Sequence, residues 1–218
     1  MEKPILFNTE MVKAILKGRK TTTRRIIKRT SSNDEPCGYG FWKEYNEDNK
    51  RWYIKDYTHA CVWWTLEEYI RKFSKYQIGD ILYVRETWLA HSRGLNTIAI
   101  KYKADDAINE CVSFTKERFN KFYKFADQEK WQPSLFMPKE AARIFLKVTD
   151  VRVERLQDID YDNLISEGTE IPRFATEEAL KVNFKNLWNG TLKKDLVKVY
   201  SWDTNPYVWV IQFEVIER

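Results

Sequence analysis

The alternation of short strands with short helices constrains the fold of this 218-residue chain more than any other feature. Alternating apolar and polar residues predict strands over residues 81–88, 98–103, 144–156 and 207–215. Helical periodicity and capping residues predict helices over residues 9–17, 65–73, 160–167 and 176–188. The regular βαβ spacing of a parallel sheet is absent. We therefore expect an α+β fold, in which short helices flank a small, mostly antiparallel β-barrel.

A single domain is expected over residues 1–218, with an insertion at residues 31–76. Within the insertion we expect a polar loop, a hairpin over residues 41–54 and a helix that begins with a capping box. Residues 106–130 are polar and are expected to be partly helical. In the strand over residues 144–156 the apolar phase shifts midway, which predicts a β-bulge.

The charge of the chain is concentrated near its start. The net charge is +5, and residues 13–29 hold eight cations and no acid. This pattern suits a polyanionic partner such as nucleic acid. Aromatic residues make up 15% of the chain, and those outside the core are candidates for base stacking.

Cysteine and histidine are too sparse to predict a metal site. Three widely spaced cysteines argue against a disulfide framework and for a reducing, cytoplasmic location. Cys37, His59 and Cys61 match no compact zinc module. No apolar run approaches the ~20 residues of a membrane span. We expect no metal, no cofactor, no membrane association and no obligate protein partner.

The basic, threonine-rich run Gly18-Arg19-Lys20-Thr21-Thr22-Thr23-Arg24-Arg25 follows directly on the first predicted helix. It resembles the signature of the ASCH family, and further stretches resemble the longer ASCH proteins of phages and prophages. These stretches are Gly79-Asp80, Val84 to Trp88, Trp131 to Pro138, Val148 to Leu156, Glu167-Gly168, Asn205-Pro206 and Trp209.

The resemblance implies a PUA-like barrel with a cleft for RNA or a nucleoside. Short bacterial members of the family are amidohydrolases that remove the acetyl group from N4-acetylcytidine with a Lys, a Thr and a Glu. By motif these catalytic residues match Lys20, Thr23 and Glu167, and Arg25 matches an arginine of the family. This chain departs from the short enzymes because it is about twice as long and has Thr22 and Arg24 at apolar positions.

The residues themselves allow two interpretations of the motif. Amide hydrolysis needs a nucleophile and a base, and lysine serves as base only if its pKa falls well below about 10.4. The neighbouring arginines would lower the pKa of Lys20. In a regular strand Lys20 and Thr23 would face opposite ways, so they converge only if the segment turns or bulges. The alternative is a basic loop that contacts phosphates.

Glu167 lies at the predicted end of a helix, where the dipole disfavours a carboxylate and raises its pKa. Such a shift suits a group that exchanges protons with the substrate. The alternative is a surface glutamate paired with a lysine or arginine.

The candidates for substrate or nucleic-acid binding are Arg19, Arg24, Arg25, Arg85, Glu86 and Trp131. Glu86 shares a strand face with apolar residues, so we expect its carboxylate to be paired, either with a cleft arginine such as Arg25 or in a strand-end salt bridge. Trp131 and Trp202 lie in polar surroundings and are the stacking candidates, whereas Trp188 and Trp209 lie on apolar faces and are expected in the core.

Two functions remain open from the sequence. One is an amidohydrolase that acts on an N4-acylated cytidine-like nucleoside. The other is a non-catalytic module that binds RNA or a modified base. A nuclease is a third possibility, but no metal-binding carboxylate cluster supports it.

Overall fold

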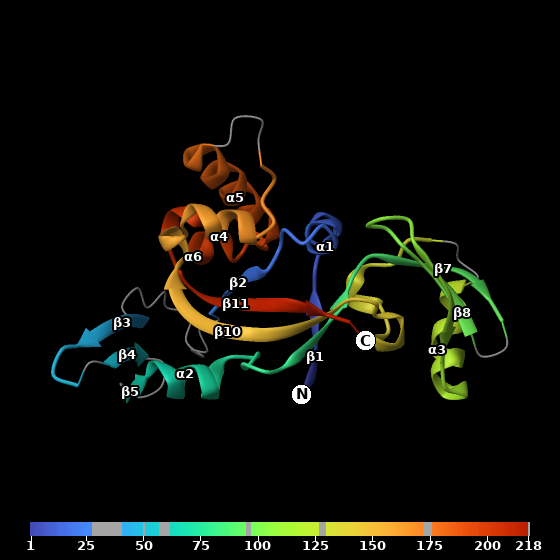
Figure 1. Cartoon of the computed structure of the whole chain (residues 1–218), viewed down its shortest axis with the longest axis horizontal. Coiled ribbons are helices and arrows are strands. Elements are labelled where there is room, and N and C mark those ends of the chain that lie inside the picture. Colours follow the sequence, from blue (N-terminus) through green and yellow to red (C-terminus); the bar gives the residue numbers. More distant parts are fainter. Residues whose placement is uncertain are drawn as a thin grey trace. The chain divides into compact units, whose positions relative to one another are not determined.

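The fold is mixed α+β, as the sequence predicts (Figure 1). The computed structural model describes residues 1–27, 41–49, 51–56, 62–94, 97–126, 130–171 and 176–217. The strands are β1 (Glu2–Leu6), β2 (Thr22–Ile26), β3 (Phe41–Asn46), β4 (Arg51–Asp56), β5 (Val62–Thr65), β6 (Ile81–Arg85), β7 (Trp88–Arg93), β8 (Thr97–Tyr102), β9 (Ile108–Ser113), β10 (Phe145–Arg155) and β11 (Tyr207–Ile216). The α-helices are α1 (Thr9–Leu16), α2 (Leu66–Phe73), α3 (Lys116–Ala126), α4 (Tyr161–Ser166), α5 (Glu177–Thr191) and α6 (Val197–Tyr200). Short 3-10 helices are η2 (Ser134–Phe136), η3 (Lys139–Ala141), η4 (Leu156–Asp158) and η5 (Trp202–Thr204).

The described strands form three sheets, with the orders β1-β6-β10-β11-β2, β3-β4-β5 and β7-β8-β9. Strand β1 runs parallel to β6, whereas β10 with β6 and β11 with β2 are antiparallel. In none of the three orders does the last strand pair back to the first. The sheets of the described residues are therefore open, and the predicted barrel is not confirmed.

The chain divides into two compact units, each assembled from segments that are distant in sequence. Unit 1 contains Met1–Lys20, Gly79–Lys147 and Glu214–Arg218, and unit 2 contains Thr21–Ile78 and Val148–Phe213. The segment 31–76, predicted to be an insertion, contributes β3, β4, β5 and α2 to unit 2. Its predicted polar loop, residues 31–40, lies outside the described residues.

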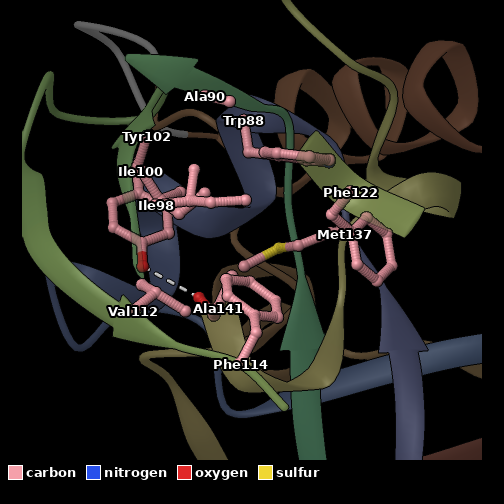
Figure 2. Packing of buried hydrophobic residues seen from close by; sticks show 10 residues of the cluster. All are labelled: Trp88, Ala90, Ile98, Ile100, Tyr102, Val112, Phe114, Phe122, Met137 and Ala141. Atoms are coloured by element: carbon pink, nitrogen blue, oxygen red, sulfur yellow. Dashed lines mark hydrogen bonds between the residues drawn. The ribbon is translucent and has the colours of Figure 1, made fainter. Parts of the chain in front are cut away.

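The apolar cluster of unit 1 packs helix α3 against β7 and β8 (Figure 2). Trp88, Ile100 and Tyr102 are almost completely buried in it, and the Tyr102 hydroxyl donates a hydrogen bond of 2.8 Å to the Ala141 carbonyl. The predicted strand over residues 98–103 and the partly helical segment that follows are confirmed as β8 and α3. Strand β9 was missed because its sequence mixes polar and apolar residues without a regular alternation, although Val112 packs in the cluster.

The predicted strand over residues 81–88 is in fact two strands. Glu86 and Thr87 separate β6 from β7, which belong to different sheets. The Glu86 amide donates to the sulfur of Met137, and the Glu86 carboxylate binds Arg143. These long-range contacts replace the sheet pairing, so local alternation could not predict the break.

The apolar cluster of unit 2 packs α4 and α5 against β11. Its fully buried members are Leu156, Leu164, Leu180, Val208 and Val210. Helix α5 continues past its predicted end at residue 188 to Thr191. The Thr191 hydroxyl donates to the Trp188 carbonyl at 2.7 Å, and the Trp188 indole donates to the Tyr200 carbonyl. These contacts stabilise the last turn despite Gly190.

Local signals for helix starts are confirmed, and the bulge predicted in β10 stays a prediction that its burial pattern supports. Asn8 caps α1, Thr65 and Glu68 form the capping box of α2, and Asp160 caps α4. The burial pattern of β10 changes phase near Thr149, where the bulge was expected. Among the described helices, none is both long enough and apolar enough to cross a bilayer.

Candidate functional site

The threonine- and arginine-rich motif forms strand β2, which pairs with β11 and places Thr23 opposite Ile211 and Arg24 opposite Val210. Before it, Gly18 ends α1 with a left-handed backbone, φ 69°. The amides of Arg19 and Lys20 then donate to the Ala14 carbonyl, which fixes the turn into the strand. Because side chains alternate along a strand, Thr23 and Arg25 share one face of β2 and Arg24 lies on the other.

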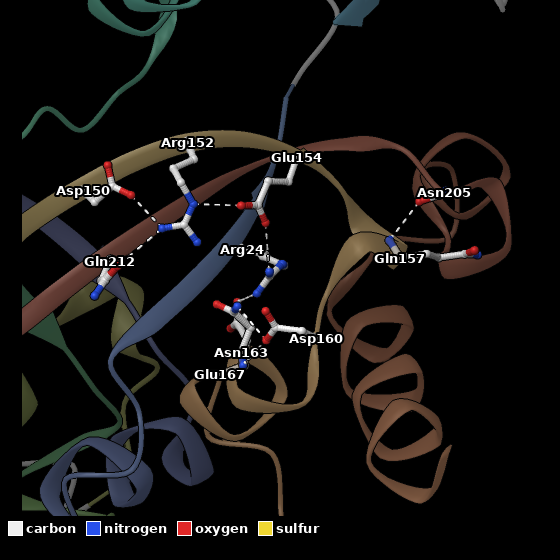
Figure 3. A network of polar contacts seen from close by, with 10 residues as sticks. All are labelled: Arg24, Asp150, Arg152, Glu154, Gln157, Asp160, Asn163, Glu167, Asn205 and Gln212. Carbon is white, nitrogen blue, oxygen red and sulfur yellow. Dashed lines mark hydrogen bonds and ion pairs between the residues drawn. The ribbon is translucent and has the colours of Figure 1, made fainter. Parts of the chain in front are cut away.

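Arg24 is buried between two carboxylates (Figure 3). Its Nη1 lies 3.0 Å from Oε1 of Glu167, and its Nη2 lies 3.2 Å from Oε2 of Glu154. Its Nε has no hydrogen-bond partner among the described residues. Arg24 is thus a buried, paired group in this structure, and its contact with a nucleic acid stays a prediction.

A row of alternating charges extends from Arg24 along β10 (Figure 3). The Arg152 Nε donates to Oε1 of Glu154 at 2.8 Å, and its Nη1 donates to Oδ2 of Asp150 at 2.6 Å. Asp150, Arg152 and Glu154 alternate in sequence and therefore share one face of β10. Glu154 accepts from both arginines and so joins the two parts of the row.

Helix α4 places Glu167 at this row. Asp160 accepts from the Asn163 amide at the start of the helix, and Glu167 is the C-cap residue, followed by Gly168 in a left-handed conformation, φ 80°. The hydrogen bond from the Asn163 amide lowers the pKa of Asp160, and the charges of Arg24 and Arg152 act in the same direction. Glu167 lies at the C-terminal end of α4, as expected from the sequence, and its carboxylate is paired there with Arg24.

Arg25 lies near Glu167 and near a tyrosine that the sequence analysis missed. Burial lowers the pKa of Arg25, whereas electrostatic interactions with Tyr76 and Glu167 act to raise it. Tyr76 is itself buried. Glu167 is thus paired with Arg24 and influences Arg25 electrostatically, and both arginines belong to the predicted motif.

Lys20 and Thr23 are buried, with exposed fractions of 1% and 2%. The Lys20 Nζ lies 5.4 Å from the centre of the Phe7 ring, and Arg19 beside it is half-buried. The boundary between the two units falls between Lys20 and Thr21. Lys20 is therefore described with unit 1, Thr23 and Glu167 are described with unit 2, and the convergence of the three stays a prediction.

No protein-family model, curated protein or solved structure matches this chain. The resemblance to the ASCH family thus rests on the motif residues.

Arg85 and Glu86 make contacts within unit 1. The Arg85 Nε donates to the Met137 carbonyl at 2.8 Å, and its Nη2 donates to the Leu135 carbonyl. Arg143 binds both carboxylate oxygens of Glu86, at 2.9 and 3.0 Å. Burial raises the pKa of Glu86, although the bonds and the charge of Arg143 act in the opposite direction. Of the two expectations for Glu86, these contacts fit the salt bridge at the end of a strand.

The tryptophans divide between the core and partly exposed positions. Trp188 and Trp209 are buried, as expected. Trp202 packs edge-on against Phe184 at 5.9 Å, so it is a poor stacking candidate. Trp131 is half-buried, with the Lys103 Nζ 5.9 Å from its ring centre, and stays a candidate.

A pocket of about 570 Å³ was not anticipated from the sequence. It lies in unit 2 and is lined by α2, by Trp52 of β4 and by the charged face of β10. The alternation of Asp150, Arg152 and Glu154 was visible in the sequence, but nothing local indicated what faces it. No group of three or more metal-ligating side chains occurs in the described part of the chain, and Cys37, His59 and Cys61 lie outside it.

Proposed function

We propose that this chain binds a modified nucleoside, free or within RNA, and hydrolyses an acyl amide on its base. The supporting observation is the burial of the polar side chains of the motif. Lys20, Thr23 and Glu167 are each at most 3% exposed. A loop that only contacts phosphates exposes its cations, whereas buried ionisable groups are costly and are often kept at reactive sites.

In the proposed reaction the Thr23 oxygen attacks the acyl carbonyl while Lys20, in its neutral form, takes the hydroxyl proton. Burial favours the neutral form of a lysine. The C–N bond then breaks, the leaving amine of the nucleoside receives a proton, and water hydrolyses the acyl ester on Thr23. Arg25 stabilises the oxyanion, and Glu167 orients the substrate or transfers the proton to the amine. We also propose that the strands adopt a PUA-like arrangement and that the protein is located in the cytoplasm, as the sequence suggests.

The test is the release of cytidine from N4-acetylcytidine by the 218-residue chain, measured by chromatography. Thr23→Val and Lys20→Met should each lower the rate by about 1000-fold or more, and the double variant should lose little beyond this. Thr22→Val is the matched control because Thr22 is buried in the same strand on the other face.

Equal losses in the Thr22 and Thr23 variants would show an effect on folding and not on chemistry. If the wild type binds RNA but releases no cytidine, the proposed hydrolysis is wrong and the chain is a non-catalytic binding module. A Lys20→Met variant with full activity would contradict the mechanism.

A further inference from the structure

The pocket of unit 2 has an aromatic and apolar part. Trp52 is 45% exposed at its rim and contacts Tyr45, with ring centres 5.1 Å apart. Leu66 and Ile70, one turn apart on α2, and Val151 of β10 line the same pocket. A partly exposed indole ring beside aliphatic side chains suits a flat ring as ligand.

The polar part of the pocket carries charges of both signs. Arg152 engages one oxygen of Asp150, Oδ2, which fixes the orientation of that carboxylate. Glu67 and Arg71, which are exposed on α2, and Glu154 of β10 complete the charged lining. Carboxylates accept hydrogen bonds from N–H groups, and an exposed arginine suits a phosphate.

We propose that this pocket binds a nucleotide. The base stacks on Trp52 and donates N–H hydrogen bonds to Asp150, and the phosphate contacts Arg71. The volume of about 570 Å³ lies within the range of small-molecule sites, roughly 300–1,000 Å³. The inference goes beyond the proposed function and stands without it, because it requires no reaction at Thr23.

The composition of the lining favours a nucleotide over a basic side chain of a protein partner. Carboxylates with an indole would also attract a lysine or an arginine. The same pocket also contains Arg71, whose cation suits the phosphate of a nucleotide and has no counterpart on a basic side chain. A nucleotide uses the aromatic ring, the acceptors and the cation together.

The experiment titrates the 218-residue chain with GMP, CMP, AMP and UMP and follows the indole N–H resonances by NMR. Trp52→Phe assigns the Trp52 signal. Guanine presents two adjacent N–H donors to a carboxylate, so GMP should bind most tightly. Trp52→Ala should weaken binding by about 10- to 100-fold. Asp150→Asn should weaken GMP more than UMP, and Arg71→Ala should weaken GMP more than guanosine.

Tyr123→Ala, which changes an exposed aromatic residue of unit 1, is the control and should leave GMP binding unchanged. Urea midpoints confirm that each variant is folded. The proposal is overturned if GMP does not shift the Trp52 resonance, if Trp52→Ala binds GMP normally, or if only an arginine-containing peptide shifts that resonance. Cytidine release that depends on Thr23, without a Trp52 shift, would remove this inference and leave the proposed function intact.

Discussion

Arg24 belongs to the most basic segment of the chain, yet its guanidinium is enclosed by Glu154 and Glu167. The two carboxylates differ in burial, since the side chain of Glu167 is 4% exposed and that of Glu154 is 24% exposed. A buried charge that loses its partner is strongly destabilising, whereas a more exposed partner is partly replaced by water. At the scale of single residues, the contribution of each ion pair to stability therefore depends on how deeply its carboxylate is buried.

We predict that Glu167→Ala lowers the free energy of unfolding by about 3–5 kcal/mol and that Glu154→Ala lowers it by about 1 kcal/mol. Urea denaturation measures both values. Glu214→Ala removes the exposed pair with Lys147 and should have almost no effect. Similar losses of unfolding free energy in Glu167→Ala and Glu154→Ala would contradict the idea that burial decides the contribution of each carboxylate.

Among the elements, α4 is short and is defined at both ends by named contacts. Its N-terminal Asp160 accepts from the Asn163 amide at 2.7 Å, and its C-cap is Glu167. A helix of six residues has little intrinsic stability, so its caps and its packing through Leu164 hold it in place. The position of Glu167 beside Arg24 depends on these local contacts.

We predict that Asp160→Ala costs about 1 kcal/mol of stability at neutral pH and that Asp160→Asn, which preserves the cap, costs less. The pKa of Asp160 is lower in the folded chain than its ordinary value of 3.8. Its ionic contribution is therefore complete above that value and disappears as the pH falls through the folded-state pKa.

Urea midpoints measured from neutral pH down to about pH 2 test this prediction. The wild type should lose its advantage over Asp160→Asn in the acid range. An advantage that persists at the lowest pH would show that the charge of Asp160 does not contribute.

At the scale of the whole molecule, neither compact unit is one continuous stretch of chain. Unit 1 has three segments and unit 2 has two, and both β10 and β11 run from one unit into the other. An independently folding domain usually has one boundary in an exposed linker. This connectivity indicates that the two units unfold together.

We predict that Ile100→Ala in unit 1 and Leu164→Ala in unit 2, both fully buried, each cost about 2–5 kcal/mol. Each variant should shift one common unfolding transition, observed through NMR signals from both units. If the Leu164 variant unfolds unit 2 while unit 1 keeps its signals, the units are independent.

The sequence by itself determined the local structure of this protein. The capping box at Thr65, the helix over residues 160–167 and the phase shift of β10 were predicted correctly, because each depends on residues within a few positions of one another. It also singled out Arg24, Arg25 and Glu167 as candidate residues, without indicating which of them are in contact.

Only the tertiary structure decided these contacts. Arg24 and Glu167 are 143 positions apart, and Glu86 and Arg143 are 57 apart. No local periodicity encodes such pairs, because they form only when strands and helices pack together. The nucleotide pocket has the same origin, since Trp52 and Asp150 belong to separate segments of the chain. The burial of Lys20, Thr23 and Arg24, which the basic composition of the segment did not indicate, is likewise a property of the packed chain.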